Sequence, residues 1–274
     1  MKKNILYSLI VLVGLFTACK KGTDPKPVDP IVDADPYKHY RPIEVAGDDG
    51  TISKYSYNTA NQVIKLDYFE KDNNVTKLIS SQTFSYTNGK LAQVVQENAT
   101  ATKYISDYKY QGNTDIIESS SSNGIDYSNP TKPVITSTNN SDYSYLSGKI
   151  SKSTIKDVNN IPVIIANYTF SMKGENPFVT VDYVPQAVNG IPANPPYSAT
   201  TEYYKDVINP VSYFFSYSTS LSKFITKSET FSLSPNSTYN QTYELDNLGR
   251  IKTISTINPT TNSTIKTTYT YEKY

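Results

Sequence analysis

Apolar and polar residues alternate along most of the chain beyond residue 37. β-Branched and aromatic side chains are abundant there, and no stretch carries apolar residues at positions i, i+3, i+4 and i+7 over three turns. Alternation with a period of two is typical of strands that bury one face, whereas the missing spacing is typical of amphipathic helices. The pattern therefore predicts a single all-β domain over residues 37–274.

One short motif recurs along this domain. It consists of two aromatic residues one position apart, a turn that usually contains Gly or Asn, a basic residue and an aliphatic residue. Copies begin at Tyr55, Phe84, Tyr108, Tyr143, Tyr168, Tyr243 and Tyr269, and some of them are partial. Asn88-Gly89 suits a type I′ turn, and Gly249 suits the end of a longer turn. We expect each copy to form a β-hairpin, and the hairpins together to form an antiparallel meander.

Two segments interrupt this rhythm. Asn113–Asp142 is rich in Ser and Asn, and Val184–Tyr197 is rich in Pro. Pro cannot donate to a central ladder, so the second segment is expected to leave the sheet. Loops longer than about 12 residues are uncommon unless they are functional or disordered. The loop at 184–200 is therefore either a contact for a ligand or partner, or a tolerated surface insertion.

The N-terminus predicts an export signal. Lys2 and Lys3 precede an apolar run from Ile5 to Phe16, which is shorter than the roughly 20 residues that a membrane-spanning helix needs. Small residues then precede Cys19, the only Cys of the chain, in a pattern that resembles a bacterial lipobox. We predict a signal peptide over residues 1–18 and a diacylglycerol on Cys19. An ordinary secretory signal with a chance Cys is the alternative.

Residues 19–36 carry four prolines and predict a semi-rigid tether between the lipid and the domain. Lys20 and Lys21 follow the Cys where retention at the inner membrane would favour Asp. We therefore expect a lipid-anchored protein of the outer membrane, on its periplasmic or its outer face. The net charge of +1 offers no basic stripe, so a nucleic-acid partner is not expected.

The sequence offers little chemistry. Glu244 and Asp246 have the i, i+2 spacing that could place two carboxylates on one strand face, as a retaining glycosidase requires, but a hairpin turn explains both. Asp48-Asp49-Gly50 is the nearest calcium-like cluster and does not fit the spacing of a calcium loop. His39 is the only His and has no acidic neighbour in sequence. We predict no catalytic residue, no metal site and no cofactor.

Tyrosine is the unusual feature of the composition, with 25 Tyr and no Trp. Most of these rings are expected to be half-buried in the sheet with their hydroxyls at the water edge. The functional alternative is a concave aromatic face that accepts a glycan, a peptide or an apolar ligand. The candidate ligand-binding residues are Tyr86, Tyr143, Tyr145 and Tyr197.

Several weak motifs occur together in order. They are the lipobox, the Pro-rich tether, Tyr168–Phe178, Leu221–Lys223 with Lys227, the Tyr243 hairpin and Thr268–Glu272. As a set they resemble Bacteroidota lipoproteins that carry an uncharacterised domain with a porin-like fold. The Tyr243 hairpin alone is also similar to the tyrosine-aspartate repeats of Rhs-type proteins.

The first resemblance implies one long antiparallel sheet that curves into an open half-barrel, and a β-sandwich is the alternative. It also implies a non-enzymatic lipoprotein that binds a ligand or partner through this sheet. A structural protein that packs against other envelope components is the second hypothesis. A glycan hydrolase is a remote third.

Overall fold

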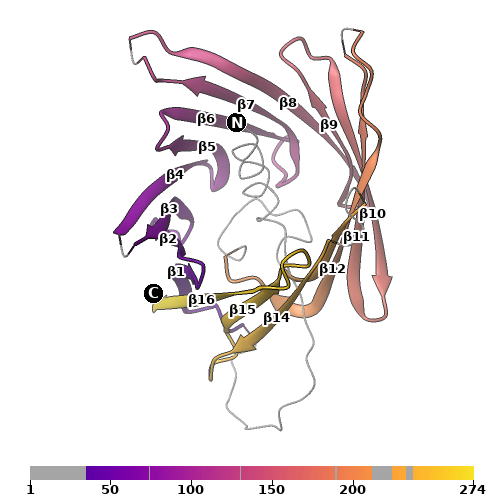
Figure 1. Ribbon diagram of the computed structural model, residues 1–274. Coiled ribbons are helices and arrows are strands. Elements are labelled where there is room, and N and C mark those ends of the chain that lie inside the picture. Colours follow the sequence, from indigo (N-terminus) through magenta and orange to yellow (C-terminus); the bar gives the residue numbers. More distant parts are fainter. Residues whose placement is uncertain (1–34, 74, 130, 189, 212–223, 233–236) are drawn as a thin grey trace.

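The computed structural model describes residues 35–73, 75–129, 131–188, 190–211, 224–232 and 237–274, and these form a closed antiparallel β-barrel (Figure 1). None of the described residues is helical. The strands are β1 (Tyr40–Gly47), β2 (Thr51–Tyr57), β3 (Val63–Asp72), β4 (Val75–Thr87), β5 (Lys90–Asn98), β6 (Thr102–Tyr110), β7 (Ile117–Asp126), β8 (Val134–Leu146), β9 (Lys149–Lys156), β10 (Pro162–Lys173), β11 (Asn176–Pro185), β12 (Tyr197–Ile208), β13 (Phe224–Phe231), β14 (Thr238–Leu245), β15 (Ile251–Ile257) and β16 (Thr264–Lys273).

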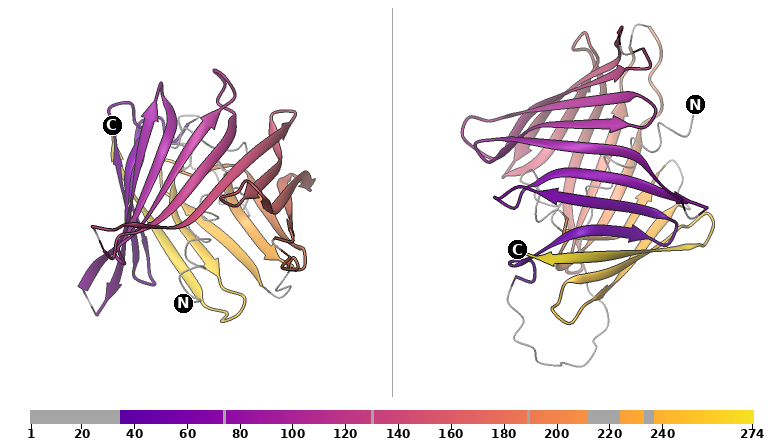
Figure 2. Two further views of the ribbon diagram at one scale, coloured as in Figure 1. Left: turned by 90° about the horizontal axis from the view of Figure 1, so that it is seen from above. Right: turned by 90° about the vertical axis from the view of Figure 1, so that its left-hand side faces the viewer.

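Each strand pairs with its neighbours in sequence, which confirms the antiparallel meander. The expected open half-barrel is wrong, and so is the β-sandwich, because β1 also pairs with β16 from Tyr40↔Lys273 to Gly47↔Thr267. Figure 2 shows these two strands side by side. An open sheet would leave a row of unpaired backbone groups on each edge, and closure satisfies both rows at once.

Five of the seven copies of the recurring motif share one structural form. The second aromatic residue, or Leu245 in the Tyr243 copy, pairs with the aliphatic residue that follows the turn, and the register shifts beside that pair. These pairs are Tyr57↔Val63, Tyr86↔Leu91, Tyr110↔Ile117, Tyr145↔Ile150 and Leu245↔Ile251. A bulge lets two residues on one strand face one on its partner and increases the local twist. Each of these five copies is therefore a bulged hairpin that bends the wall toward closure, whereas the Tyr168 copy pairs Phe170 with Val179 without a register shift.

Gly249 shows why the turn needs glycine. Its φ is 77°, and its N–H donates to the carbonyl of Asp246 over 3.1 Å. A β-branched residue is strained at a positive φ, whereas Asn tolerates it.

Gly249→Val is expected to lower the free energy of unfolding by about 1–3 kcal/mol. Gly249→Asn should cost well under half as much, because only the β-branched side chain opposes the left-handed backbone. Urea melts of the two variants make the comparison. Equal stabilities would contradict the turn geometry.

The two segments that interrupt the sequence pattern have different structures. Asn113–Asp142 was expected to interrupt the sheet, but it contains β7 and most of β8, which pair over Ser119↔Asp142 to Asp126↔Val134. Neighbouring strands on both sides outweigh the low strand propensity of Ser and Gly. In the Pro-rich segment the chain leaves the sheet after Pro185 and returns at Tyr197, as expected.

The barrel has two ends, which we call proximal and distal. Residue 35, Tyr274 and the hairpins with aromatic motifs lie at the proximal end, since β1 starts and β16 finishes there. The distal end holds the alternate connections, including 48–50, 157–161, the Pro-rich loop 186–196 and 258–263.

Two apolar clusters identify the lumen face of the wall. One cluster contains Tyr37, Leu66 and Leu91, and Ile208 and Val211 pack against it. Ile208 is the last residue of β12, and Val211 lies just after it. Because β12 is not adjacent to β3 or β5 in the sheet, this contact crosses the lumen. A second cluster joins β11, β12, β13 and β15, and its buried members are Val179, Tyr203, Tyr204, Ile225, Ile251 and Ile254.

Candidate ligand site in the barrel lumen

The outward face of the wall carries charges. Lys54 pairs with Asp67 in register, and the same row continues through Ser81 and Glu97 to Lys103. Further ion pairs lie on this face, and their oxygen–nitrogen distances are 2.7 Å for Lys65–Asp67, 2.6 Å for Lys103–Glu97 and 3.3 Å for Lys266–Glu244. A row of charged residues therefore lies on the outward face from β2 to β6, while the two apolar clusters and their tyrosines face the lumen.

Tyrosine hydroxyls connect neighbouring hairpins at the proximal end. Five residues take part, and we call them the proximal tyrosines. Their contacts are Tyr57 to the Pro42 carbonyl at 2.5 Å, Tyr86 to Val63 at 2.7 Å, Tyr110 to Leu91 at 3.0 Å, Tyr271 to Ile251 at 2.7 Å, and Tyr145 to the backbone of Ile117. In each case the hydroxyl reaches back to a strand earlier in the chain. These rings therefore hold the wall together at this end.

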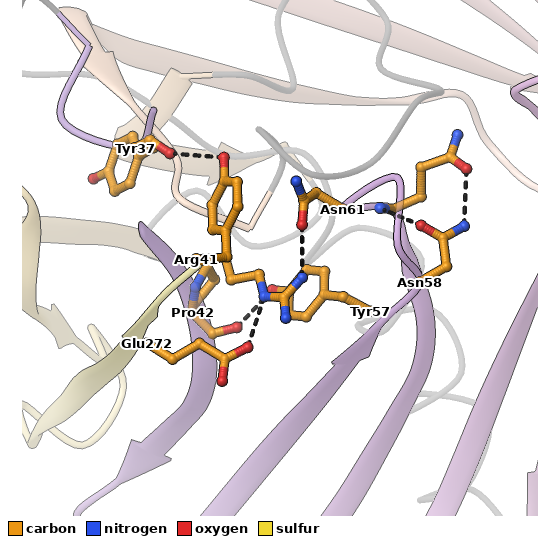
Figure 3. Close-up of polar contacts among 9 residues, drawn as sticks. Tyr37, Arg41, Pro42, Tyr57, Asn58, Asn61 and Glu272 are labelled. Carbon is orange, nitrogen blue, oxygen red and sulfur yellow. Dashed lines mark hydrogen bonds and ion pairs between the residues drawn. The ribbon is translucent and has the colours of Figure 1, made fainter. Parts of the chain in front are cut away.

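Arg41 locks the seam between β1 and β16 (Figure 3). Its Nε donates to Glu272 over 2.7 Å, and its Nη1 donates to the Asn61 side-chain oxygen over 2.7 Å. The guanidinium also lies 4.4 Å from the ring centroid of Tyr57. This planar group fits carboxylate and aromatic partners together, which Lys would not do.

Tyr37 fills the proximal end from the turn before β1. Its side chain is buried within the first apolar cluster, and its hydroxyl accepts a hydrogen bond from the Ile251 N–H over 3.1 Å. The Tyr274 hydroxyl donates to the Tyr37 carbonyl over 3.3 Å. Burial raises the pKa of Tyr37 to about 12. Tyr37 thus joins the start of the domain to β15 through its side chain and to the C-terminus through its backbone carbonyl.

Glu202 is a buried acid whose charge is compensated. It accepts hydrogen bonds from Lys227 over 2.6 Å and from Asn176 over 3.0 Å, and Lys173 lies 3.0 Å away. Burial raises the pKa of Glu202, but these contacts outweigh it and hold that pKa below its usual value. The residue is therefore a structural anchor between β10, β11, β12 and β13.

The distal part of the lumen has a different character. Tyr183 and Tyr197 pair across β11 and β12, and their rings stack with centroids 4.8 Å apart and an interplanar angle of 16°. Burial raises the pKa of both hydroxyls. Tyr168 lies near enough to contribute to the rise at Tyr183. The described wall here presents a continuous group of tyrosines beside the Pro-rich loop.

Glu229 lies in this aromatic region on β13. Its register partners are Thr201 on β12 and Tyr239 on β14. Within the described ranges its carboxylate has no hydrogen-bond or ion-pair partner. Burial raises its pKa to about 7, and the carboxylate in turn adds to the raised pKa values of Tyr183 and Tyr203.

The four predicted ligand-binding tyrosines do not form one site. Tyr86 and Tyr145 belong to the proximal tyrosines, and the Tyr143 hydroxyl lies 3.1 Å from the Ser120 hydroxyl. Tyr197 lies at the distal end on β12. Sequence reasoning missed Glu229, although an acid two positions before Phe231 on a period-two strand was a detectable signal.

Glu244, Asp246 and Asp49 have structural roles. Glu244 accepts from the Thr253 hydroxyl over 2.9 Å on the outward face, while Asp246 accepts from the N–H groups of Leu248 and Arg250 within its turn. Asp49 accepts from Thr51 in the β1–β2 turn.

The His39 carbonyl accepts from the Tyr274 N–H and extends the seam between the chain ends. Across the described residues, no group of three His, Cys, Asp or Glu is placed to hold a metal ion. No helix in that same part of the chain has the length and apolar character needed to cross a membrane.

Comparison with known proteins supports the fold. No family model matches the chain, and no curated protein matches it. A solved structure of a porin-like protein from Bacteroides uniformis superposes with a TM-score of 0.54 at 14% identity, covering 86% of this chain and 97% of that one. A porin-like protein from Bacteroides vulgatus gives a TM-score of 0.49 at 12% identity, with 85% and 98% covered. The first likeness shows that the barrel has a porin-like fold.

Proposed function

We propose that this protein is a lipid-anchored, non-enzymatic barrel of the bacterial outer membrane that holds a ligand in its lumen. The observation that carries the proposal is the orientation of the wall: a row of charged residues crosses β2 to β6 on the outward face, and the two apolar clusters with their tyrosines face the lumen. A barrel that spans a bilayer needs an outward apolar band about 25 Å tall, and a lipid-facing Lys or Arg costs about 2–4 kcal/mol at the midplane. The outward ion pairs therefore favour a barrel in water, beside the membrane.

The proposed anchor is Cys19, which lies outside the described residues. A tether over residues 20–34 would reach roughly 50 Å at about 3.1 Å per residue. The described chain begins at the proximal end, so the tether joins the barrel there. The distal end, with the stacked tyrosines, is then free to face away from the anchoring lipid.

The lumen is the part of the molecule best suited to a ligand. At its proximal end, Tyr37, Pro42 and Pro210 are among the most deeply buried side chains. The distal wall instead carries half-buried tyrosines next to a long loop. A ligand would therefore enter at the distal end.

Exposed apolar side chains at the distal rim favour a second candidate function, which is contact with another envelope protein. Several of the large apolar side chains that are exposed lie on distal connections or beside them. Their exposed fractions are 67% for Val75, 60% for Val134, 66% for Ile135, 65% for Val158 and 70% for Ile191. A partner protein that covers this rim would bury them.

Cys19→Ala is expected to release the protein from membranes into the soluble fraction without detergent. The reason is that the acyl chains supply the membrane affinity, while the charged wall supplies none. Fractionation in the native host, with palmitate labelling of the wild type, measures both points. A spanning porin of the same host is the control, since it stays in the membrane fraction without lipidation.

A variant that remains membrane-bound would overturn the proposal that the barrel lies outside the bilayer. A wild type that takes up no label would overturn the anchor. The two outcomes are independent, because the first is measured on the Cys19→Ala variant and the second on the wild type.

A further inference from the structure

Two Asn-Gly pairs lie within the described residues, and the structure places them in opposite settings. Asn88-Gly89 forms the turn between β4 and β5, whereas Asn123-Gly124 lies inside β7. A third pair begins at residue 189, which lies outside the described residues. Asn is a thermolabile residue, and a following Gly has no Cβ to obstruct a reaction between the Asn side chain and the backbone. The same dipeptide can therefore be compared in two environments.

The Asn88-Gly89 turn is open to water. Its φ angles are 50° for Asn88 and 78° for Gly89, as a type I′ turn requires. Both residues are exposed, and apart from the adjoining residues no heavy atom lies within 4 Å of the position that a Cβ on Gly89 would take. Nothing in the described fold therefore crowds this turn.

The reacting groups of the turn are also free. Among the described residues, neither the Asn88 side-chain amide nor the Gly89 N–H has a hydrogen-bond partner. The ladder between β4 and β5 ends at Thr87↔Lys90, so it does not hold the Gly89 nitrogen. This nitrogen can approach the side-chain carbonyl carbon of Asn88 without breaking a hydrogen bond.

Asn123-Gly124 is held by strands on both sides. Gly124 is buried, and it pairs with Tyr104 on β6 and with Ser137 on β8. A Cβ on Gly124 would lie 2.5 Å from the Ser137 hydroxyl and 3.0 Å from the Tyr104 ring. The Asn123 side-chain oxygen accepts a hydrogen bond from the Thr138 hydroxyl over 2.9 Å. The same reaction here requires β7 to open first.

We propose that the β4–β5 turn is a site of spontaneous covalent modification, at which Asn88 is converted to aspartate and isoaspartate. The Gly89 nitrogen gives its proton to hydroxide and attacks Cγ of Asn88. A bond from Cγ to this nitrogen forms, the bond from Cγ to Nδ2 breaks, and Nδ2 leaves as ammonia with a proton from water. The product is a succinimide, and nothing is oxidised or reduced.

Water then opens the succinimide at one of its two carbonyls. Opening at the side-chain carbonyl gives aspartate, and opening at the backbone carbonyl gives isoaspartate, whose backbone is longer by one carbon. Either product replaces a neutral amide with a carboxylate next to Lys90.

The modification affects contacts beyond the turn. The Gly89 carbonyl accepts a hydrogen bond from Nε2 of Gln62 over 2.8 Å, which connects this turn to the preceding proximal turn. Nζ of Lys90 donates to the Thr114 carbonyl over 2.6 Å and connects it to the following one. The longer isoaspartate backbone displaces Gly89 between these two contacts. The inference goes beyond the proposed function, because it describes how the proximal end changes with the age of the protein.

The test incubates the full chain in a non-ionic detergent at pH 8 and 37 °C and follows both pairs by peptide mass spectrometry. Conversion raises the mass of a peptide by about 1 Da, and chromatography separates isoaspartate from aspartate. Asn88 should convert at least about tenfold faster than Asn123, because the buried pair reacts only when its strand opens. In concentrated urea the two rates should become similar.

Gly89→Asn is the matched variant, because Asn tolerates the positive φ of this turn and its Cβ obstructs the attacking nitrogen. It should slow conversion of Asn88 by about tenfold and leave Asn123 unchanged. Circular dichroism establishes that the barrel is folded.

Two results would overturn the inference. One is an Asn88 that converts in urea but stays intact in the folded protein, since the turn would then protect it. The other is equal conversion of Asn88 and Asn123 in the folded protein, since the rate would then not depend on the structure around each pair.

Discussion

Tyr37→Ala should destabilise the barrel by about 3–5 kcal/mol, as expected when a large buried ring is truncated. Tyr37 is 1% exposed and belongs to the first apolar cluster. Its removal would leave a cavity at the proximal end and would also strip the Ile251 N–H of its acceptor. Urea unfolding followed by circular dichroism measures the loss.

Tyr37→Phe separates packing from hydrogen bonding. It keeps the ring and leaves the Ile251 N–H unpaired, so it should cost about 1–3 kcal/mol. Tyr274→Ala removes a side chain that is 39% exposed, together with its bond to the Tyr37 carbonyl and its contact with Arg41, and should cost less than Tyr37→Ala. A Tyr37→Ala variant within about 1 kcal/mol of wild type would show that this residue does not close the proximal end.

Glu229→Gln is expected to make the protein more stable at pH 8, by up to about 3 kcal/mol. The folded pKa is about 7 against an ordinary value of 4.5, so the folded state holds this proton more tightly than the unfolded state. The stability that the proton contributes is fully present below about pH 4.5 and is lost as the pH rises through 7. Gln does not titrate, so the free energy of unfolding of Glu229→Gln should fall less as the pH rises.

Urea melts of wild type and Glu229→Gln at pH 5 and pH 8 test the direction of this change in stability. The two proteins should have similar stability at pH 5 and diverge at pH 8. Glu244→Gln should not show the divergence, because the pKa of Glu244 is lowered by the Thr253 and Lys266 contacts. Parallel pH profiles for wild type and Glu229→Gln would mean that Glu229 is well hydrated in the lumen.

The hairpins could be predicted from sequence because each one is specified locally. The Tyr243 copy contains its strand alternation, its turn and its glycine within a few residues. Closure could not be predicted, because Tyr40–Gly47 and Thr264–Lys273 are more than 200 residues apart and either could have remained an edge strand. The strand Ile117–Asp126 was missed for the opposite reason, since its residues favour strands weakly and its neighbours impose the structure.

The candidate site was only partly predictable. The abundance of tyrosine indicated an aromatic face, and alternation placed those rings on one side of the sheet. Sequence does not reveal which hydroxyls are already bonded, so Tyr86 and Tyr197 were equivalent until the bond from Tyr86 to Val63 and the stack of Tyr197 on Tyr183 were known. Sequence also does not reveal that Glu229 is half-buried on β13, while Glu202 on the adjacent strand lies among lysines.

The proximal tyrosines also bear on how such a barrel could change in evolution. In the contacts from Tyr86 to Val63 and from Tyr110 to Leu91, a hairpin supplies one hydroxyl to the hairpin before it and one carbonyl to the hairpin after it. A duplicated hairpin would bring its own hydroxyl and its own carbonyl, so the junctions on either side would be preserved. Duplication or deletion of one hairpin within the gene could therefore widen or narrow the barrel by two strands without requiring a new kind of contact.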